Sequence, residues 1–94
     1  MPELNWPAGD WYDYTIRLAT GKTVGAAVVD HPKNPPATWH NPRYVWMINP
    51  SIVAKGPVTV KEGAPLTLRY RVVVHDGATP TALLDTLAKE WRRP

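Results

Sequence analysis

The side chains best suited to chemistry in this sequence are its three histidines. His31 begins a proline-dense loop, His40 lies near the far end of that loop, and His75 lies where the most regular strand pattern ends. Neutral imidazoles bind Cu, Zn, Fe and Ni, and three of them leave coordination positions open for water or substrate. Each histidine also has a polar neighbour that could orient its ring: Asp30, Asn41 and Asp76. We therefore predict a shared transition-metal site formed by His31, His40 and His75.

Copper is the metal expected at such a site, because an all-imidazole ligand set suits it and divalent copper heads the affinity order. Zinc would bind the same ligands and support hydrolysis instead. The histidines do not, however, show a compact His-x-His or His-x-x-x-His spacing. The alternative is therefore that they are ordinary turn histidines that bond to the backbone, with no metal bound.

Other catalytic arrangements have less support. Cysteine is absent, which excludes disulfides, thiolate nucleophiles and iron–sulfur clusters. Ser51 is the only serine and lacks the flanking pattern of a nucleophile elbow, and the sequence has no glycine-rich phosphate loop. Acidic side chains at turns usually serve as caps, but two of them could converge for glycoside hydrolysis. The candidates for such a pair are Asp10, Asp13, Asp30 and Asp76.

The aromatic residues suggest a binding surface. There are 5 Trp and 4 Tyr but no Phe, so nearly every ring carries a polar group. Trp11 and Trp39 lie among polar residues and could form a platform on which sugar rings stack, with Arg43 and Tyr44 as further contacts. The alternative is that both indoles pack beneath the proline loop.

The elements that must position these side chains are mostly short strands. Alternating or continuous apolar runs predict strands in six places: 11–18, 23–29, 44–48, near 52–53, near 58–60, and 66–74. Gly21 and its neighbours form the turn between the first two. Residues 30–42 include four prolines and are expected to form a rigid, packed loop.

A C-terminal helix is predicted from about residue 80 to 92. Thr79 suits the N-cap, Pro80 suits the first helical position, and an apolar stripe ends at Trp91. Trp46 and Trp91 are expected in the core. With 94 residues the chain is long enough for one domain, 1–94. We predict a mostly β fold, a small antiparallel β-sandwich or jelly roll of the cupin-like kind, with one C-terminal helix.

Composition narrows the partners and the location. The net charge of +3 comes from 11 basic and 8 acidic residues scattered along the chain, so we expect no nucleic-acid partner. No apolar run approaches the roughly 18 residues of a membrane span, so we expect no membrane partner. The first residues lack a signal-peptide pattern, so we expect a soluble protein, secreted only if a leader has already been removed.

Several motifs occur in the same order as in a known bacterial family. They are 11–14 (WYDY), 28–35 (VVDHPKNP), 39–40 (WH), 48–50 (INP) and 66–77 (LTLRYRVVVHDG). On these motifs the chain resembles the C-terminal part of the family labelled methane oxygenase PmoA. The resemblance implies that His31, His40 and His75 are motif histidines. It also implies a carbohydrate partner, because similar proteins are encoded near sugar-degrading enzymes. Methane oxidation itself is not expected, because nothing in this sequence could span a membrane.

Assembly and function follow from these expectations. Members of that family are longer, so this chain would expose an apolar sheet face, which a two-fold homodimer would bury. We predict a copper-binding metalloprotein that acts on polysaccharide, by oxidative glycan cleavage if it is an enzyme. One alternative is a non-catalytic carbohydrate-binding module that uses the same tryptophans. Another is an inactive fragment of a larger sugar-catabolism protein.

Overall fold

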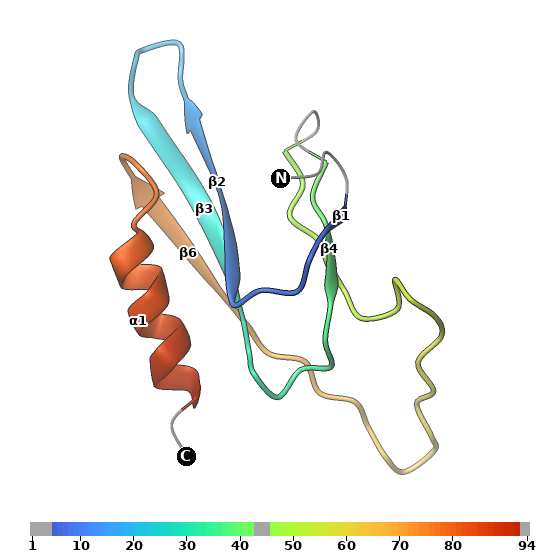
Figure 1. Ribbon diagram of the computed structural model, residues 1–94. Helices are drawn as coiled ribbons and strands as arrows, with labels where there is room; N and C mark the ends of the chain where they lie inside the picture. The colour runs from blue at the N-terminus through green and yellow to red at the C-terminus, as the bar shows by residue number, and fades with distance from the viewer. Residues whose placement is uncertain (1–4, 43–45, 93–94) are drawn as a thin grey trace.

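The computed structural model describes residues 5–42 and 46–92, which form two three-stranded antiparallel sheets and a C-terminal helix (Figure 1). Strands β2 (Trp11–Arg17), β3 (Thr23–Asp30) and β6 (Tyr70–Asp76) make the larger sheet, in the order β2-β3-β6. Strands β1 (Asn5–Trp6), β4 (Thr38–His40) and β5 (Pro50–Ser51) make the smaller sheet, in the order β1-β4-β5. Helix α1 (Thr81–Arg92) follows β6. The arrangement is consistent with a small β-sandwich, so the predicted fold class is confirmed.

The hairpin of β2 and β3 forms where the alternation predicts it. Its register runs from Trp11 opposite Val29 to Arg17 opposite Thr23. Gly21 has φ 88° in the connecting turn, and glycine adopts this left-handed conformation without the steric cost that a Cβ would bring. Turn chemistry and alternation therefore agree at this hairpin.

Strand β6 pairs antiparallel with β3, with Val73 opposite Ala27. The strand predicted at 66–74 begins only at Tyr70 and continues to Asp76. The reason lies in the loop after β3, where the Asn34 side chain bonds to the backbone N–H and C=O of Arg69 at 2.9 and 2.7 Å. A side chain thus takes the place of a neighbouring strand, and regular pairing starts one residue later.

One hydrophobic core lies between α1 and the larger sheet. Its buried members are Ala27, Val29, Leu84 and Ala88, and three partly buried side chains pack against them: Trp11, Val73 and Trp91. The small side chains of Ala27 and Ala88 allow the helix to approach the sheet closely. Fully burying a side chain such as Leu84 contributes about 2 kcal/mol. The apolar stripe predicted on the helix is therefore the stripe that faces the sheet.

A second, aromatic core joins the two sheets. Trp6, Ala37 and Trp39 are buried there. The ring of Tyr12 on β2 meets both indoles edge to face, with centroids 4.9 Å from Trp6 and 5.0 Å from Trp39. Because Ala37 belongs to the proline-dense loop, this loop is packed against the sheets, as predicted.

Several sequence predictions need correction. Residues 52–53 lie in a turn and 58–60 lie outside any strand of the described chain, because 53–69 is exposed throughout and has no strand partner there. Of the strand predicted at 44–48, residues 44 and 45 lie outside the described residues. Trp46 has φ 52°, which is not strand geometry, and it is 60% exposed rather than in the core. Strands β1, β4 and β5 were missed, because two or three residues carry no detectable periodicity.

Candidate functional site

The three histidines lie in different parts of the fold. His75 is opposite Gly25 in the β3–β6 register, whereas His31 directly follows the other end of β3. Six residues of strand separate these two backbone positions by about 20 Å. His40 belongs to β4 in the other sheet, where its Nδ1 lies 3.0 Å from Asn5 Oδ1. Among the described residues no group of three His, Cys, Asp or Glu side chains is placed to hold a metal ion. Copper binding remains a prediction, and one chain does not assemble the shared site proposed for it.

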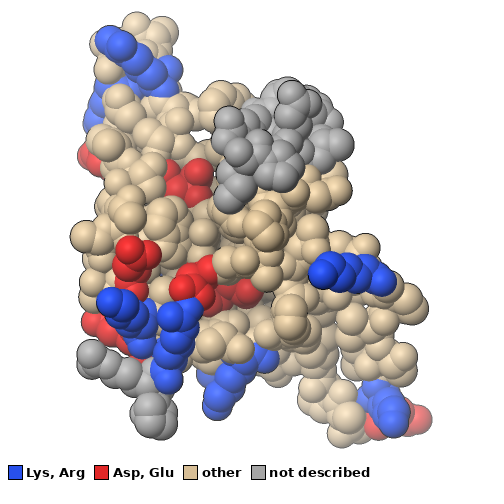
Figure 2. Space-filling view, viewed as in Figure 1, with Lys and Arg blue, Asp and Glu red and all other residues tan. Residues whose placement is uncertain are grey.

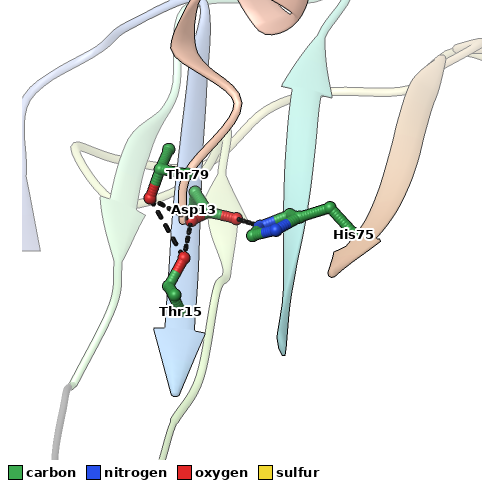
Figure 3. Close-up of polar contacts among 4 residues, drawn as sticks. All are labelled: Asp13, Thr15, His75 and Thr79. Atoms are coloured by element: carbon green, nitrogen blue, oxygen red, sulfur yellow. Dashed lines mark hydrogen bonds and ion pairs between the residues drawn. The ribbon is translucent and has the colours of Figure 1, made fainter. Parts of the chain in front are cut away.

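His75 instead forms a buried polar cluster with Asp13, Thr15 and Thr79 (Figure 3). Its Nε2 lies 2.7 Å from Asp13 Oδ1, across strand β3. The other carboxylate oxygen of Asp13 accepts hydrogen bonds from the hydroxyls of Thr15 at 2.5 Å and Thr79 at 2.7 Å. The Thr79 hydroxyl therefore donates its hydrogen bond to Asp13, and this contact links the segment before α1 to strand β2.

Gly25 makes this contact possible. It lies on β3 opposite Thr15 on β2 and His75 on β6, and the imidazole passes over it to reach Asp13. A Cβ at this position would lie 2.6 Å from His75 Nε2 and 2.4 Å from the carbonyl oxygen of Tyr14. Both distances are far inside van der Waals contact. The glycine is therefore needed because the histidine side chain occupies the space where its own side chain would be.

The cluster is closed to solvent. The side chains of Asp13 and His75 are 2% and 7% exposed. Burial raises the pKa of Asp13, but the hydrogen bonds from Thr15, Thr79 and His75 outweigh it, so the pKa lies below its ordinary value. The second ring nitrogen of His75 is buried without a hydrogen-bond partner in the described chain. A ligand has no access to this pair, and its role is to hold β2, β6 and the start of α1 together.

The two tryptophans predicted to form a sugar platform lie in different cores of the fold. Trp39 is completely buried in the aromatic core, which corrects its assignment as a substrate contact. Trp11 is partly buried against α1, and its Nε1 donates to Asp85 Oδ1 at 2.9 Å. The alternative, packing beneath the proline loop, describes Trp39, which shares its core with Ala37 of that loop, whereas Trp11 packs against α1 instead. Arg43 and Tyr44, the other predicted contacts, lie outside the described residues.

A pocket that the sequence did not single out lies between the loop after β3 and the segment before β6. It has a volume of about 180 Å³ and is lined by His31, Lys33, Asn34, Thr67 and Arg69. Three of these five side chains are basic. The backbone N–H of Lys33 donates to His31 Nδ1 at 3.0 Å, so the proton of the neutral ring is on Nε2 and can be donated. The pocket thus presents hydrogen-bond donors and positive charge.

Asn34 holds the two walls of this pocket together. It is 9% exposed, and besides its two bonds to the Arg69 backbone it donates from Nδ2 to Asp30 Oδ1 at 2.7 Å. Burial raises the pKa of the Asp30 carboxyl above its ordinary value, partly offset by this hydrogen bond. The positions of Lys33 and Arg69 are therefore set by a buried amide rather than by a flexible loop.

The basic residues continue beside the pocket. The ring of His31 lies 4.8 Å from that of Trp91, and the guanidinium of Arg71 lies 4.7 Å from the Trp91 ring. At the same end of α1, Arg92 forms an ion pair with Asp10. Figure 2 shows Lys and Arg side chains around this end of the helix, with acidic side chains among them. The surface around this end of the helix is therefore mixed in charge.

Fold and pocket together define a small two-sheet β domain with a basic surface pocket. The chain belongs to a family of unknown function, DUF6807, whose family model matches residues 2–89. The resemblance to the methane oxygenase PmoA family is therefore wrong, since the matching family has no known function and no methane oxygenase family is found. No curated protein and no solved structure shows significant similarity to the chain. No helix in the described ranges is long and apolar enough to cross a membrane.

Proposed function

We propose that this protein is a non-catalytic binding domain whose basic pocket holds the carboxylate of an acidic carbohydrate. The observation that carries the proposal is the convergence of His31, Lys33 and Arg69 on one pocket whose walls Asn34 fixes. An arginine guanidinium pairs with a carboxylate through two parallel hydrogen bonds, and a lysine adds charge. Because the walls are tied before a ligand arrives, little conformational freedom is lost on binding.

The size and lining of the pocket favour binding over chemistry. Small-molecule sites usually have volumes of at least about 300 Å³. A pocket of about 180 Å³ suits one acidic sugar ring, with the rest of an oligosaccharide outside. The five lining residues include no carboxylate, thiol or serine, so the pocket lacks the carboxylate pair of a glycosidase and the usual nucleophiles of esterases and proteases. This supports the alternative of a carbohydrate-binding module, at a site different from the predicted tryptophans.

The test is calorimetric titration with an oligogalacturonate, a neutral oligosaccharide of the same length, and citrate. We expect the oligogalacturonate to bind, the neutral sugar to bind at least 10-fold more weakly, and affinity to fall with added salt. Citrate distinguishes a site for acidic sugars from a site for any carboxylate. If citrate binds as tightly as the oligogalacturonate, the pocket is an anion site with no preference for carbohydrate.

Variants locate the site. Arg69→Gln removes the charge at the pocket and should weaken binding about 10-fold, since a charge-assisted hydrogen bond contributes about 1.5 kcal/mol. Lys61→Gln removes one charge from the exposed segment 53–69 and should leave affinity unchanged. Equal losses in both variants, or no oligogalacturonate binding by the unmodified protein, would overturn the proposal.

A further inference from the structure

Strand β6 has an unpaired edge. Within the described chain it is the outer strand of the larger sheet. The N–H of His31 donates to the Arg69 carbonyl at 3.3 Å, and the N–H of Gly77 donates to the Thr23 carbonyl at 2.7 Å. Hydrogen bonding alternates along an antiparallel pair, so these two bonds fix its phase. Residues 71, 73 and 75 point their N–H and C=O groups at β3, and residues 70, 72, 74 and 76 point theirs away from it.

The same residues expose an apolar surface. Tyr70, Val72 and Val74 are 37%, 63% and 80% exposed. Val74 borders an apolar pocket of about 280 Å³ that continues over β3 and β2, on the face opposite α1. Natural edge strands are usually protected by proline, a bulge or a charged side chain on the exposed face. Tyr70, Val72 and Val74 provide none of these, and the charge of Arg71 lies on the helix side. The charged residue of β6 on the exposed face is Asp76, at the very end of the strand, where it pairs with Lys22.

The chain exposes more surface than a compact monomer of its mass. A monomer of 10.5 kDa normally exposes about 5,400 Å², whereas this chain exposes 6619 Å². Its radius of gyration is 14.9 Å, against about 12.4 Å for a compact domain of this length. The chain thus exposes about 1,200 Å² more than a compact monomer of its mass, and its exposed residues include segment 53–69 as well as the open sheet face.

We propose that a second copy of this chain pairs with β6 along this edge, antiparallel and across a two-fold axis at Val73. This register uses all four outward-pointing residues, because Val72 lies opposite the partner's Val74 and Tyr70 lies opposite the partner's Asp76. The result is a six-stranded sheet whose valines form one apolar strip. Because the edge of β6 is complementary to the same edge of a second copy, no other partner is needed to cover it.

The rest of the fold permits this pairing. Helix α1 packs on β3 rather than over the free edge of β6. In the paired sheet the two β3 strands are three strand spacings apart, about 14 Å. Helices that pack against each other are about 8–10 Å apart. The two helices therefore lie on the same face without overlapping, and the β6 edges can meet.

Sedimentation velocity of the full chain at concentrations from about 1 to 100 μM tests the proposal. We expect a dimer to form within this range, because modest interfaces have dissociation constants of about this size. Val72→Pro removes an N–H that does not bond to β3, so the sheet should stay folded while the edge can no longer pair. Val72→Thr keeps the N–H and serves as the matched control. We expect Val72→Pro to be monomeric and Val72→Thr to associate. A monomeric unmodified chain, or a Val72→Pro protein that still dimerises, would overturn the inference.

Two further variants keep the test decisive if Val72→Pro fails to fold. Val74→Lys places a charge at a position that is 80% exposed, so it should fold and fail to associate, whereas Val53→Lys at 54% exposure should associate normally. Because the chain has no cysteine, the register can be tested by disulfide formation. A mixture of Val72→Cys and Val74→Cys chains should cross-link faster than either chain alone, and equal rates would contradict the axis at Val73.

Discussion

The two faces of the larger sheet are made by the same strands, yet they differ completely in how they are covered. On one face α1 packs against Ala27 and Val29, and the buried pair of Asp13 and His75 lies beside that core. On the other face the second sheet covers Tyr12, while Val74 remains 80% exposed. Alternation along a strand determines which residues share a face. Whether that face is buried depends on elements elsewhere in the chain.

The largest effect that would break this contrast is expected at Gly25. In Gly25→Ala the new methyl group would overlap the Tyr14 carbonyl and the His75 ring, so strand β2 must move away from β3 and the ring must leave its position. We expect a loss of about 3 kcal/mol in the free energy of unfolding, measured by urea denaturation. Gly9→Ala is the control, because its Cβ would meet only ordinary contacts at 3.5 Å. A small loss at Gly25 would mean that His75 does not occupy this space.

Asp13→Asn should lower the free energy of unfolding by a smaller amount, about 2 kcal/mol. The change removes a buried, charged group that accepts three hydrogen bonds. The pKa of Asp13 is lowered in the folded state, so its contribution is complete above the ordinary value of 3.8 and is lost as the pH falls below it. The stability difference between the two proteins should therefore shrink in acid. Urea titrations between pH 7 and pH 2.5 provide the measurement.

Asp76→Asn is the matched control for this prediction. Asp76 pairs with Lys22 at 3.4 Å, but its side chain is 78% exposed, so the change should cost less than about 0.5 kcal/mol at any pH. If the stability of both variants depends on pH in the same way, the loss of stability in acid does not come from the buried cluster of Asp13 and His75.

The smallest expected effect compares two neighbouring valines. Val73 packs against the core beneath α1, whereas Val74 points to the open face. Truncating either valine to alanine lowers strand propensity by a similar amount. The difference between the two losses of stability therefore reports how deeply each side chain is buried. We expect Val73→Ala to cost about 1 kcal/mol more than Val74→Ala, by urea denaturation at concentrations where the chain is monomeric. Equal costs would mean that the two faces are covered to the same extent.

Part of the fold could be predicted because its signals are local. The hairpin of β2 and β3 is indicated by alternation and by Gly21, and helix α1 by its apolar stripe after Pro80. The start of β6 could not be predicted, because the alternation from Leu66 continues unchanged while Asn34, far away in sequence, takes the strand partner's place at Arg69. Trp46 was placed in the core because its neighbours are apolar, but a left-handed backbone turns it outward.

The candidate sites were harder to predict. Asp13 and His75 are 62 residues apart and meet only through the register of two strand pairs. One signal was present: an isolated glycine inside the β3 pattern indicates close approach by another group. The basic pocket combines Lys33 and Arg69 from separate segments, and neither residue belongs to a recognisable motif. The histidines stood out by residue type alone, which gives no information on their separation.

The amide of Asn34 offers one donor and one acceptor to the backbone of Arg69, as a peptide group in a neighbouring strand would. A single side chain therefore continues the sheet past the end of β3, and the main chain is free to turn away. The pocket residues His31 and Lys33 lie on the turn that this amide fixes, so they can be replaced while the junction with β6 is kept. Across related sequences such a fixed point would let the ligand preference diverge rapidly without changing the architecture that carries it.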